Sequence, residues 1–331
     1  MLLLTREDIR RALPMAGAIE AVASAFAQLA DGQAQVPLRS RVEAPAHEGV
    51  GLFMPAYLAG SDALGLKTLT LFPHNPERHG LPAIAALVVL FDATHGQPLA
   101  LLEGGYLTAL RTGAASGLAT RLMARDDAHT LVLFGAGAQA LAQVWAVCEA
   151  RAIERVWLVN RSTEHAARLA AELRAFGPPI PDDIGVADDA ATALADADVV
   201  CCATASPTPL FADGAVRTGT HINGIGSYLP TMHEVPPATV ARSRVVVDQR
   251  TAARAEAGDL IIAREQGLIG EEHVVAELGE VVLGRVPGRT DTQQVTFFKS
   301  VGIAVQDVAV AHAAYARAHV LGLGRAWSLD S

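Results

Sequence analysis

Residues 130–140 read Thr-Leu-Val-Leu-Phe-Gly-Ala-Gly-Ala-Gln-Ala, and this stretch decides the fold. A short apolar run typical of a buried strand leads directly into Gly135, Gly137 and Ala140, which are spaced as Gly-x-Gly-x-x-Ala. In a dinucleotide-binding turn the first glycine makes the tight turn, the second lets the backbone approach a pyrophosphate, and the third small residue lets helix and strand pack closely. The motif alone is weak, but its place between a strand and a helix is the context it requires. The stretch therefore predicts a dinucleotide at the amino end of a helix.

The residues around this turn alternate between strand and helix patterns. Strand-like runs follow at residues 155–159, 198–203, 221–225 and 244–247, with helical stretches between them. This alternation predicts an α/β fold with a doubly wound parallel sheet of the Rossmann type. Before it, residues 36–42, 50–54, 63–71 and 85–91 look like strands separated by turns, and residues 303–321 form one long helical pattern. The chain thus has a second, α+β region beside the parallel sheet.

Composition excludes several other classes of protein. The chain has 331 residues, of which 51% are hydrophobic and 18% charged, and this argues against disorder. A net charge of −9 argues against a nucleic-acid partner. The apolar runs are far shorter than the roughly 18 residues that span a membrane, and the opening residues do not resemble a signal peptide. The three cysteines, Cys148, Cys201 and Cys202, have no zinc-like spacing. We therefore expect a reduced, cytoplasmic, globular protein.

The type of coenzyme is predicted from the end of the second strand. NAD sites usually place an acid there to bind the ribose 2′-hydroxyl. This chain has Asn160, Arg161 and Ser162 instead. An arginine would pair with a 2′-phosphate that a carboxylate would repel, so NADP(H) is favoured and NAD(H) is the alternative. The other interpretation of Arg161 is a solvated surface charge.

Three cations lie in apolar surroundings in the first region. They are Arg39, Lys67 within Leu-Lys-Thr-Leu, and Arg111 within Ala-Leu-Arg-Thr. An unpaired buried cation costs several kcal/mol, so each needs an anionic partner. Either each pairs with a carboxylate of the protein, or together they bind a small carboxylate ligand, which an arginine fork suits.

The chain resembles the ornithine cyclodeaminase/mu-crystallin family over essentially its full length. The resemblance rests on an ordered series of stretches: residues 37–40, 54–57, 66–67, 108–116, 135–139, 160–161, 221–226, 276–280 and 298–302. It implies a homodimer whose subunit has a substrate-binding and dimerisation domain over residues 1–122, a Rossmann domain over residues 123–300, and a C-terminal segment, residues 301–331, that returns to the first domain.

The resemblance also implies a chemistry. Family members bind the carboxylate of an amino or imino acid with residues that match Arg39, Lys67 and Arg111, and a nicotinamide exchanges hydride at the α-carbon. Cyclodeaminases and the related alanine dehydrogenases carry an aspartate where this chain has Tyr228. A phenol is a poor base at neutral pH, so the departure counts against ornithine cyclodeamination.

The favoured activity is therefore reduction of a cyclic ketimine, Δ1-pyrroline-2-carboxylate or Δ1-piperideine-2-carboxylate, to L-proline or L-pipecolate. The alternatives are an ornithine cyclodeaminase, an alanine-type dehydrogenase, or a non-catalytic binding protein like mu-crystallin. Lys67 or Tyr228 supplies the proton, or Tyr228 merely lines the pocket.

Further positions complete the predicted site. Asn223 follows a strand and is expected to bond the nicotinamide amide. Asp307 is either a helix first-turn acid or a residue of the active cleft. No metal is expected. The positions predicted to bind the coenzyme are Gly135, Gly137, Ala138, Gln139, Asn160, Arg161, Ser162, Thr204 and Asn223.

Overall fold

The computed structural model describes residues 1–328, which divide into two compact units. Unit 1 comprises residues 1–111 and 303–328, and unit 2 comprises residues 112–302. The division falls within a continuous helix, α4 (Gly104–Met123), at residues 111/112, whereas the sequence placed it at 122/123. The C-terminal helix α12 (Ala304–Leu321) belongs to unit 1.

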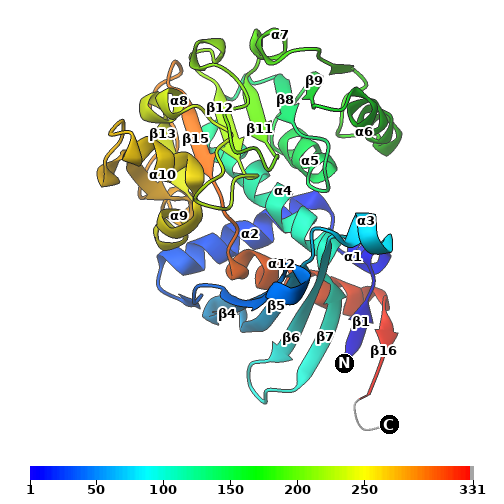
Figure 1. Cartoon of the computed structure of the whole chain (residues 1–331). Coiled ribbons are helices and arrows are strands. Elements are labelled where there is room, and N and C mark those ends of the chain that lie inside the picture. Colours follow the sequence, from blue (N-terminus) through cyan, green and yellow to red (C-terminus); the bar gives the residue numbers. More distant parts are fainter. Residues whose placement is uncertain (329–331) are drawn as a thin grey trace. The chain divides into compact units, whose positions relative to one another are not determined.

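Unit 1 is built on a mixed eight-stranded sheet (Figure 1). Its strand order is β16-β1-β7-β6-β5-β4-β2, with β3 paired to β4. The strands are β1 (Leu2–Leu4), β2 (Ala34–Gln35), β3 (Ser40–Ala44), β4 (Gly49–Leu58), β5 (Ala63–Leu71), β6 (Ile84–Asp92), β7 (Pro98–Glu103) and β16 (Arg325–Ala326). The helices are α1 (Arg6–Ala12), α2 (Met15–Ala30), α3 (Asn75–His79) and α12.

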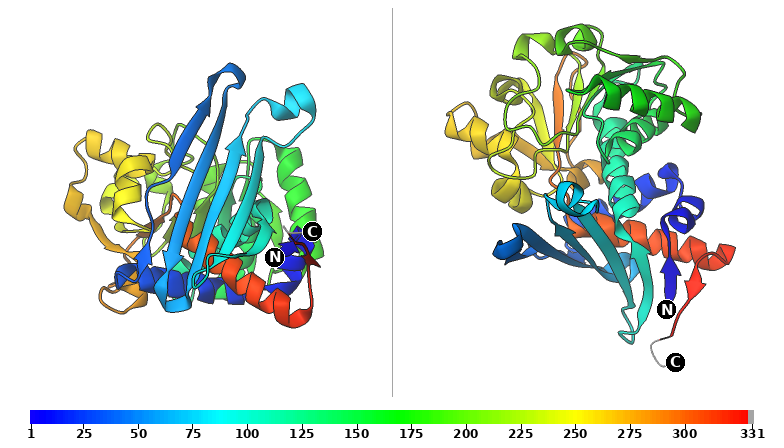
Figure 2. Two further views of the ribbon diagram at one scale, coloured as in Figure 1. Left: turned by 90° about the horizontal axis from the view of Figure 1, so that it is seen from below. Right: turned by 45° about the vertical axis from the view of Figure 1, so that its right-hand side comes forward.

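Helices α2 and α12 lie across one face of this sheet (Figure 2). Successive side chains of a strand point to opposite faces. The register pairs Lys67 with Met54 and Val88, and all three are buried on the face that α12 covers. Gly65 lies on the same face, where an added Cβ would come 3.1 Å from Val308 of α12. Strand β5 and α12 are therefore packed closely enough for their side chains to meet.

Unit 2 has a second eight-stranded sheet, in which every pairing is parallel, so the predicted α/β class is confirmed. Its order is β10-β9-β8-β11-β12-β15-β13-β14. The strands are β8 (Thr130–Phe134), β9 (Arg155–Val159), β10 (Ile184–Val186), β11 (Val199–Cys202), β12 (His221–Gly224), β13 (Arg244–Val247), β14 (Val274–Glu277) and β15 (Thr296–Lys299). The helices are α5 (Ala140–Ala150), α6 (Thr163–Phe176), α7 (Ala190–Leu194), α8 (Pro237–Arg242), α9 (Arg250–Glu256), α10 (Gly258–Glu265) and α11 (Leu278–Val282).

The register of this sheet sets its carboxyl edge. Val159, Phe134, Cys202 and Gly224 are paired in a row at the ends of four neighbouring strands. The loops that follow these strands therefore meet at one edge, where ligands bind in open α/β sheets. Beneath the edge, an apolar core packs β8, β9 and β11 against α5 and α6.

Among residues 1–328, no single helix is both long and apolar enough to cross a bilayer. Helices α1 and α2 reach that length and composition only when they are taken together, and the chain bends by 85° between them.

Candidate active site

A cluster of buried charges lies in unit 1 between β5, α4 and α12. Lys67 of β5 is 1% exposed, and Arg111 of α4 is 6% exposed. Asp307, in the first turn of α12, is fully buried. Its Oδ1 atom lies 2.9 Å from Lys67 Nζ and 2.9 Å from Arg111 Nε. One carboxylate oxygen is therefore shared by two cations that come from different elements of the fold.

The second contact of Arg111 is with the neighbouring residue of α12. Its Nη1 atom donates to Gln306 Oε1 at 2.6 Å. Together with the Nε bond to Asp307, this contact fixes the guanidinium plane against the first turn of α12. Both bonds are held inside unit 1, so the geometry of the cluster follows from the packing of α12 on the sheet.

Two polar atoms of this cluster are left without hydrogen-bond partners among residues 1–328. They are Asp307 Oδ2, an acceptor, and Gln306 Nε2, a donor, and both are buried. A buried polar atom without a partner is costly, typically about 1–3 kcal/mol, and such atoms in native proteins call for an explanation. Here the unsatisfied acceptor and donor lie beside the shared ion pair.

Burial and the neighbouring positive charges of the cluster lower the pKa of Lys67. The pKa of Lys67 is lowered to about 8, mainly by burial and in addition by the positive charges of Arg111 and Arg39, against the opposing effect of Asp307. Arg39 is half-buried and directly precedes β3. Its charge acts on Lys67, so the third predicted cation lies within electrostatic range of Lys67.

The sequence left open whether these cations pair with the protein or bind a ligand. The structure gives a mixed result, because Asp307 pairs with both Lys67 and Arg111 but supplies only one negative charge. Asp307 is a first-turn acid of α12, and it contacts two of the predicted site residues. The cluster keeps an excess of positive charge.

The carboxyl edge of unit 2 fits a dinucleotide. Gly135 adopts φ +101°, a conformation that residues with a Cβ rarely adopt, and its N–H donates to Val159 O at 2.9 Å. A Cβ added at Gly137 would meet open space, so the backbone there is accessible. No side chain caps the amino end of α5, which follows Ala138 and Gln139. The N–H of Ala140 donates to Gly137 O at 3.0 Å, and the uncapped helix end that follows can face a pyrophosphate.

The residues after β9 form the next part of this edge. Ser162 caps α6 by accepting from His165 N at 3.3 Å, and Asn160 donates to Ser162 O at 2.9 Å. These bonds fix the loop in which Arg161 stands, and Arg161 itself is exposed. Thr204 follows β11 and lies beside the glycine turn, because an added Cβ on Gly135 would be 3.0 Å from Thr204 Cγ2.

The prediction for Asn223 is corrected by the structure. Its side chain is fully buried and donates to Thr120 Oγ1 at 3.0 Å and to Cys201 Sγ, while its Oδ1 atom contacts His221 Nε2 at 3.2 Å. The residue lies within β12, where the alternation of the strand turns this side chain into the interior. The Asn223 side chain therefore makes internal hydrogen bonds and is not exposed to a nicotinamide. Tyr228, further along the loop, is half-buried.

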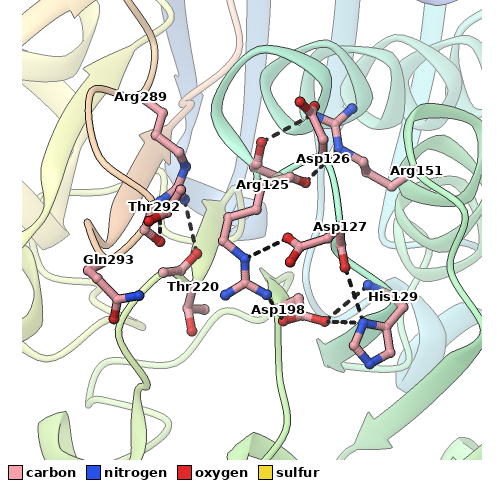
Figure 3. A network of polar contacts seen from close by, with 12 residues as sticks. Arg125, Asp126, Asp127, His129, Arg151, Asp198, Thr220, Arg289, Thr292 and Gln293 are labelled. Carbon is pink, nitrogen blue, oxygen red and sulfur yellow. Dashed lines mark hydrogen bonds and ion pairs between the residues drawn. The ribbon is translucent and has the colours of Figure 1, made fainter.

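A second polar network lies at the opposite, amino edge of the same sheet (Figure 3). Asp198 accepts from Arg125 at 2.6 Å and from the N–H groups of His129 and Thr130. Arg289 donates to the carbonyls of Met123 and Gly219 and to other nearby main-chain oxygens. A cavity of about 860 Å³ lies here, but its arginines bind carboxylates and main-chain carbonyls, as structural residues do.

Comparison with known proteins agrees with this geometry. A sequence model of the ornithine cyclodeaminase/mu-crystallin family matches residues 1–320. The chain therefore belongs to this family, and the predicted membership is confirmed.

Individual relatives resemble the chain over its whole length. A Δ1-pyrroline-2-carboxylate reductase of Bacillus cereus is 37% identical over 326 residues, which cover 98% of each protein. The structure of the Thermococcus litoralis Δ1-pyrroline-2-carboxylate reductase in complex with NADH and L-proline is 40% identical, with a TM-score of 0.93, and the match covers 99% of this chain and 100% of that one. An archaeal alanine dehydrogenase dimer with bound NAD is 33% identical, with a TM-score of 0.91 and 99% coverage of both chains.

Proposed function

We propose that the protein is an NAD(P)H-dependent ketimine reductase. It reduces a cyclic imino acid, Δ1-pyrroline-2-carboxylate or Δ1-piperideine-2-carboxylate, to L-proline or L-pipecolate. The observation that carries the proposal is the single carboxylate, Asp307, shared by the buried cations Lys67 and Arg111. The full-length similarity to pyrroline-2-carboxylate reductases supports it.

The charge of the cluster favours an anionic ligand. Lys67 and Arg111 carry two positive charges against one carboxylate, and a buried cation without a counter-ion is costly. A substrate carboxylate would supply the missing negative charge, with the second Nη of Arg111 as a donor, because the contacts to α12 use only Nε and Nη1. Arg39, whose charge reaches Lys67, is proposed to bind the same carboxylate. Such a clamp acts mainly by positioning the substrate.

The unsatisfied atoms match the rest of such a substrate. A protonated cyclic imine presents an N–H donor next to the carbon that bears its carboxylate. Asp307 Oδ2 is a buried acceptor without a partner among residues 1–328, and Gln306 Nε2 is a buried donor without one. We therefore assign Asp307 Oδ2 to the imine N–H, and Gln306 Nε2 to the carboxylate.

The reaction adds a hydride to the imine carbon and a proton to its nitrogen. The reduced nicotinamide supplies the hydride when it is bound at the carboxyl edge of unit 2. Lys67 is proposed to hold the proton, because a lysine with a pKa of about 8 is mostly protonated at neutral pH and gives up its proton more readily than an ordinary lysine. Tyr228 is the alternative donor.

We propose NADP(H) as the preferred coenzyme. No carboxylate stands among Asn160, Arg161 and Ser162 to bind a ribose 2′-hydroxyl, and the exposed Arg161 can pair with a 2′-phosphate. NAD(H) is the alternative, and two of the structures described above hold it. The ratio of the dissociation constants for NADPH and NADH decides between them.

The proposed assembly is a homodimer formed through the sheet of unit 1. Phe53 and Leu87 both pair with Thr68, so they lie on the face opposite Lys67. Both are exposed, as is Val42 further along this face. An exposed apolar sheet face marks an interaction site. The proposal keeps the cytoplasmic location that the sequence predicts.

The proposal is tested by supplying the purified protein with each cyclic imine and following NADPH or NADH absorbance. Oxidation of the coenzyme with matching formation of L-proline or L-pipecolate supports it. In parallel, release of ammonia from ornithine would instead identify a cyclodeaminase, and coenzyme reduction with L-alanine an alanine dehydrogenase. Tight binding without turnover of any substrate would identify a binding protein.

A further inference from the structure

Glu234 is a buried acid in unit 2 that the proposed reaction does not use. It is fully buried and follows the loop after β12. Its Oε1 atom accepts from Thr204 N at 2.6 Å and from Thr204 Oγ1 at 2.8 Å. Its Oε2 atom accepts from Gly226 N at 2.9 Å and from Ser227 N at 3.0 Å. One carboxylate thus joins two separate loops through four hydrogen bonds.

Both loops belong to the coenzyme edge of the sheet. Residues 203–206 follow β11 and residues 225–228 follow β12, and these strands are neighbours. The first loop also contacts the glycine turn, since a Cβ added at Gly135 would lie 2.6 Å from Ala203 O. A Cβ on Gly226 would lie 2.1 Å from Thr204 O and 2.7 Å from Glu234 Oε1. The loops therefore approach each other as closely as a glycine allows, with Glu234 between them.

The backbone around Glu234 is itself held by hydrogen bonds to α10. Asp259 Oδ1, at the start of α10, accepts from the N–H groups of Glu234 and Val235 at 2.7 and 3.0 Å. Lys299 of β15 lies with its Nζ 2.8 Å from Asp259 Oδ2 and donates to Ser227 O. The backbone of Glu234 is thus held by Asp259 of α10, which is in turn paired with Lys299 of β15.

We propose that Glu234 is a positioning residue for the coenzyme: its carboxylate holds the loops after β11 and β12 at the separation that the nicotinamide dinucleotide requires. The inference rests on the proposed dinucleotide site of unit 2 and extends it. Because Glu234 is fully buried, it would act without touching the coenzyme or the substrate. It acts through Thr204, which lies against the glycine turn, and through Ser227, which precedes Tyr228.

The ionised form of Glu234 is the form that makes these bonds. A carboxylate accepts on both oxygens, whereas a protonated carboxyl turns one of them into a donor that faces other donors. Burial raises the pKa of Glu234 to about 7, an effect that Asp259 reinforces and Lys299 opposes. The thiols of Cys202 and Cys201 in β11 also interact with it, and burial raises the pKa of both. Coenzyme affinity should thus decline as the pH falls through about 7.

The experiment measures the dissociation constant of NADH, without any imine, by fluorescence between about pH 6 and about pH 8. NADH is the probe because the 2′-phosphate of NADPH titrates near pH 6. For the wild type we expect the dissociation constant of NADH to rise about tenfold when the pH is lowered from about 8 to about 6, because the ionised fraction of a group with a pKa of about 7 falls over this range. In E234Q the dissociation constant of NADH at pH 8 should be about tenfold higher than in the wild type, and it should depend little on pH. E234D, which keeps the carboxylate, should recover the pH dependence.

A matched control separates positioning from general stability. Asp198 is a buried carboxylate of the same sheet that also accepts from backbone N–H groups, but at the opposite edge. D198N should lower the melting temperature and leave the affinity for NADH within twofold of the wild type. Equal loss of affinity in E234Q and D198N overturns the proposal, as does wild-type affinity in folded E234Q.

If E234Q does not fold, the wild-type profile alone decides, because an affinity that is flat from pH 6 to pH 8 overturns the proposal. Since no imine is present, failure of the reductase reaction leaves this outcome unaffected.

Discussion

Replacing Arg111 by alanine tests the substrate clamp, because the structure predicts a large effect on activity and a modest one on stability. The variant removes one of the two cations that share Asp307, so Lys67 and Asp307 are left as a balanced pair. The folded state loses the bonds to Asp307 and Gln306. At about 1.5 kcal/mol for each bond to a charged group, the gross cost is about 3 kcal/mol, and it is reduced because the excess buried positive charge is also removed.

The effect of R111A on catalysis follows from the lost charge. Because Nε and Nη1 contact α12, the guanidinium has its second Nη left for the substrate carboxylate, and one such charged bond contributes about 2 kcal/mol. A loss of about 2 kcal/mol corresponds to a roughly 30-fold loss of kcat/KM for the imino acid. Most of it should be a rise in KM, because the fork binds a part of the substrate that does not react.

The assay is the initial rate of NADPH oxidation against the concentration of each cyclic imine, with the dissociation constant of NADPH measured on the same preparation. Arg111→Lys is the matched control, because it keeps the charge and loses the fork. It should fall between R111A and the wild type. If R111A retains kcat/KM within threefold of the wild type, Arg111 does not bind the substrate carboxylate.

Three further predictions concern the same residues. Asp307→Asn leaves Lys67 and Arg111 buried without a carboxylate, so the free energy of unfolding should fall by about 3–5 kcal/mol; adding Arg111→Ala should recover part of that loss in denaturant titrations, and simple additivity would contradict the shared pair. If Lys67 donates the proton, kcat/KM should decline as the pH rises above about 8, because its pKa is lowered to that value; the same decline should persist in Tyr228→Phe, and its loss there would reassign the donor. Arg161→Ala should weaken NADPH binding about tenfold and leave NADH binding unchanged, and equal effects on the two coenzymes would show that Arg161 does not contact a 2′-phosphate.

The parallel sheet and its glycine turn could be predicted from the sequence because their determinants are local. An apolar strand, two glycines and a small residue stand within residues 130–140, and each acts through its own backbone conformation or its immediate neighbours. Gly135 and Gly137 lie at the carboxyl edge of the sheet, as the pattern requires. The long C-terminal helix could also be predicted from local sequence, because its pattern at residues 303–321 corresponds to Ala304–Leu321.

The partner of the predicted cations could not be identified in this way. Asp307 stands 240 residues from Lys67 and 196 from Arg111, and no spacing rule connects them. The apolar surroundings of Lys67 indicate that it needs an anion, but the sequence does not decide whether Asp307, in the first turn of the last helix, is that anion. The pairing depends on how α12 packs against β5, which is a property of the tertiary structure.

Asn223 and Glu234 illustrate two other features of the site that could not be predicted from the sequence. The end of a strand is the usual ligand edge, but whether a side chain points into the loop or into the core depends on the register of the strand, and at Asn223 it points inward. Glu234 stands in an irregular loop with no motif around it. Its role became visible only from four hydrogen bonds to residues brought together by two strands.

The most direct test of the central claim is the reduction of a cyclic imine by the purified protein. Each imine is mixed with NADPH at mildly acidic and at neutral pH, and coenzyme oxidation is compared with the amount of amino acid formed. The account predicts one L-proline or L-pipecolate for each coenzyme oxidised. Absence of oxidation with both imines and with both NADPH and NADH, in a folded preparation that binds coenzyme, would contradict it.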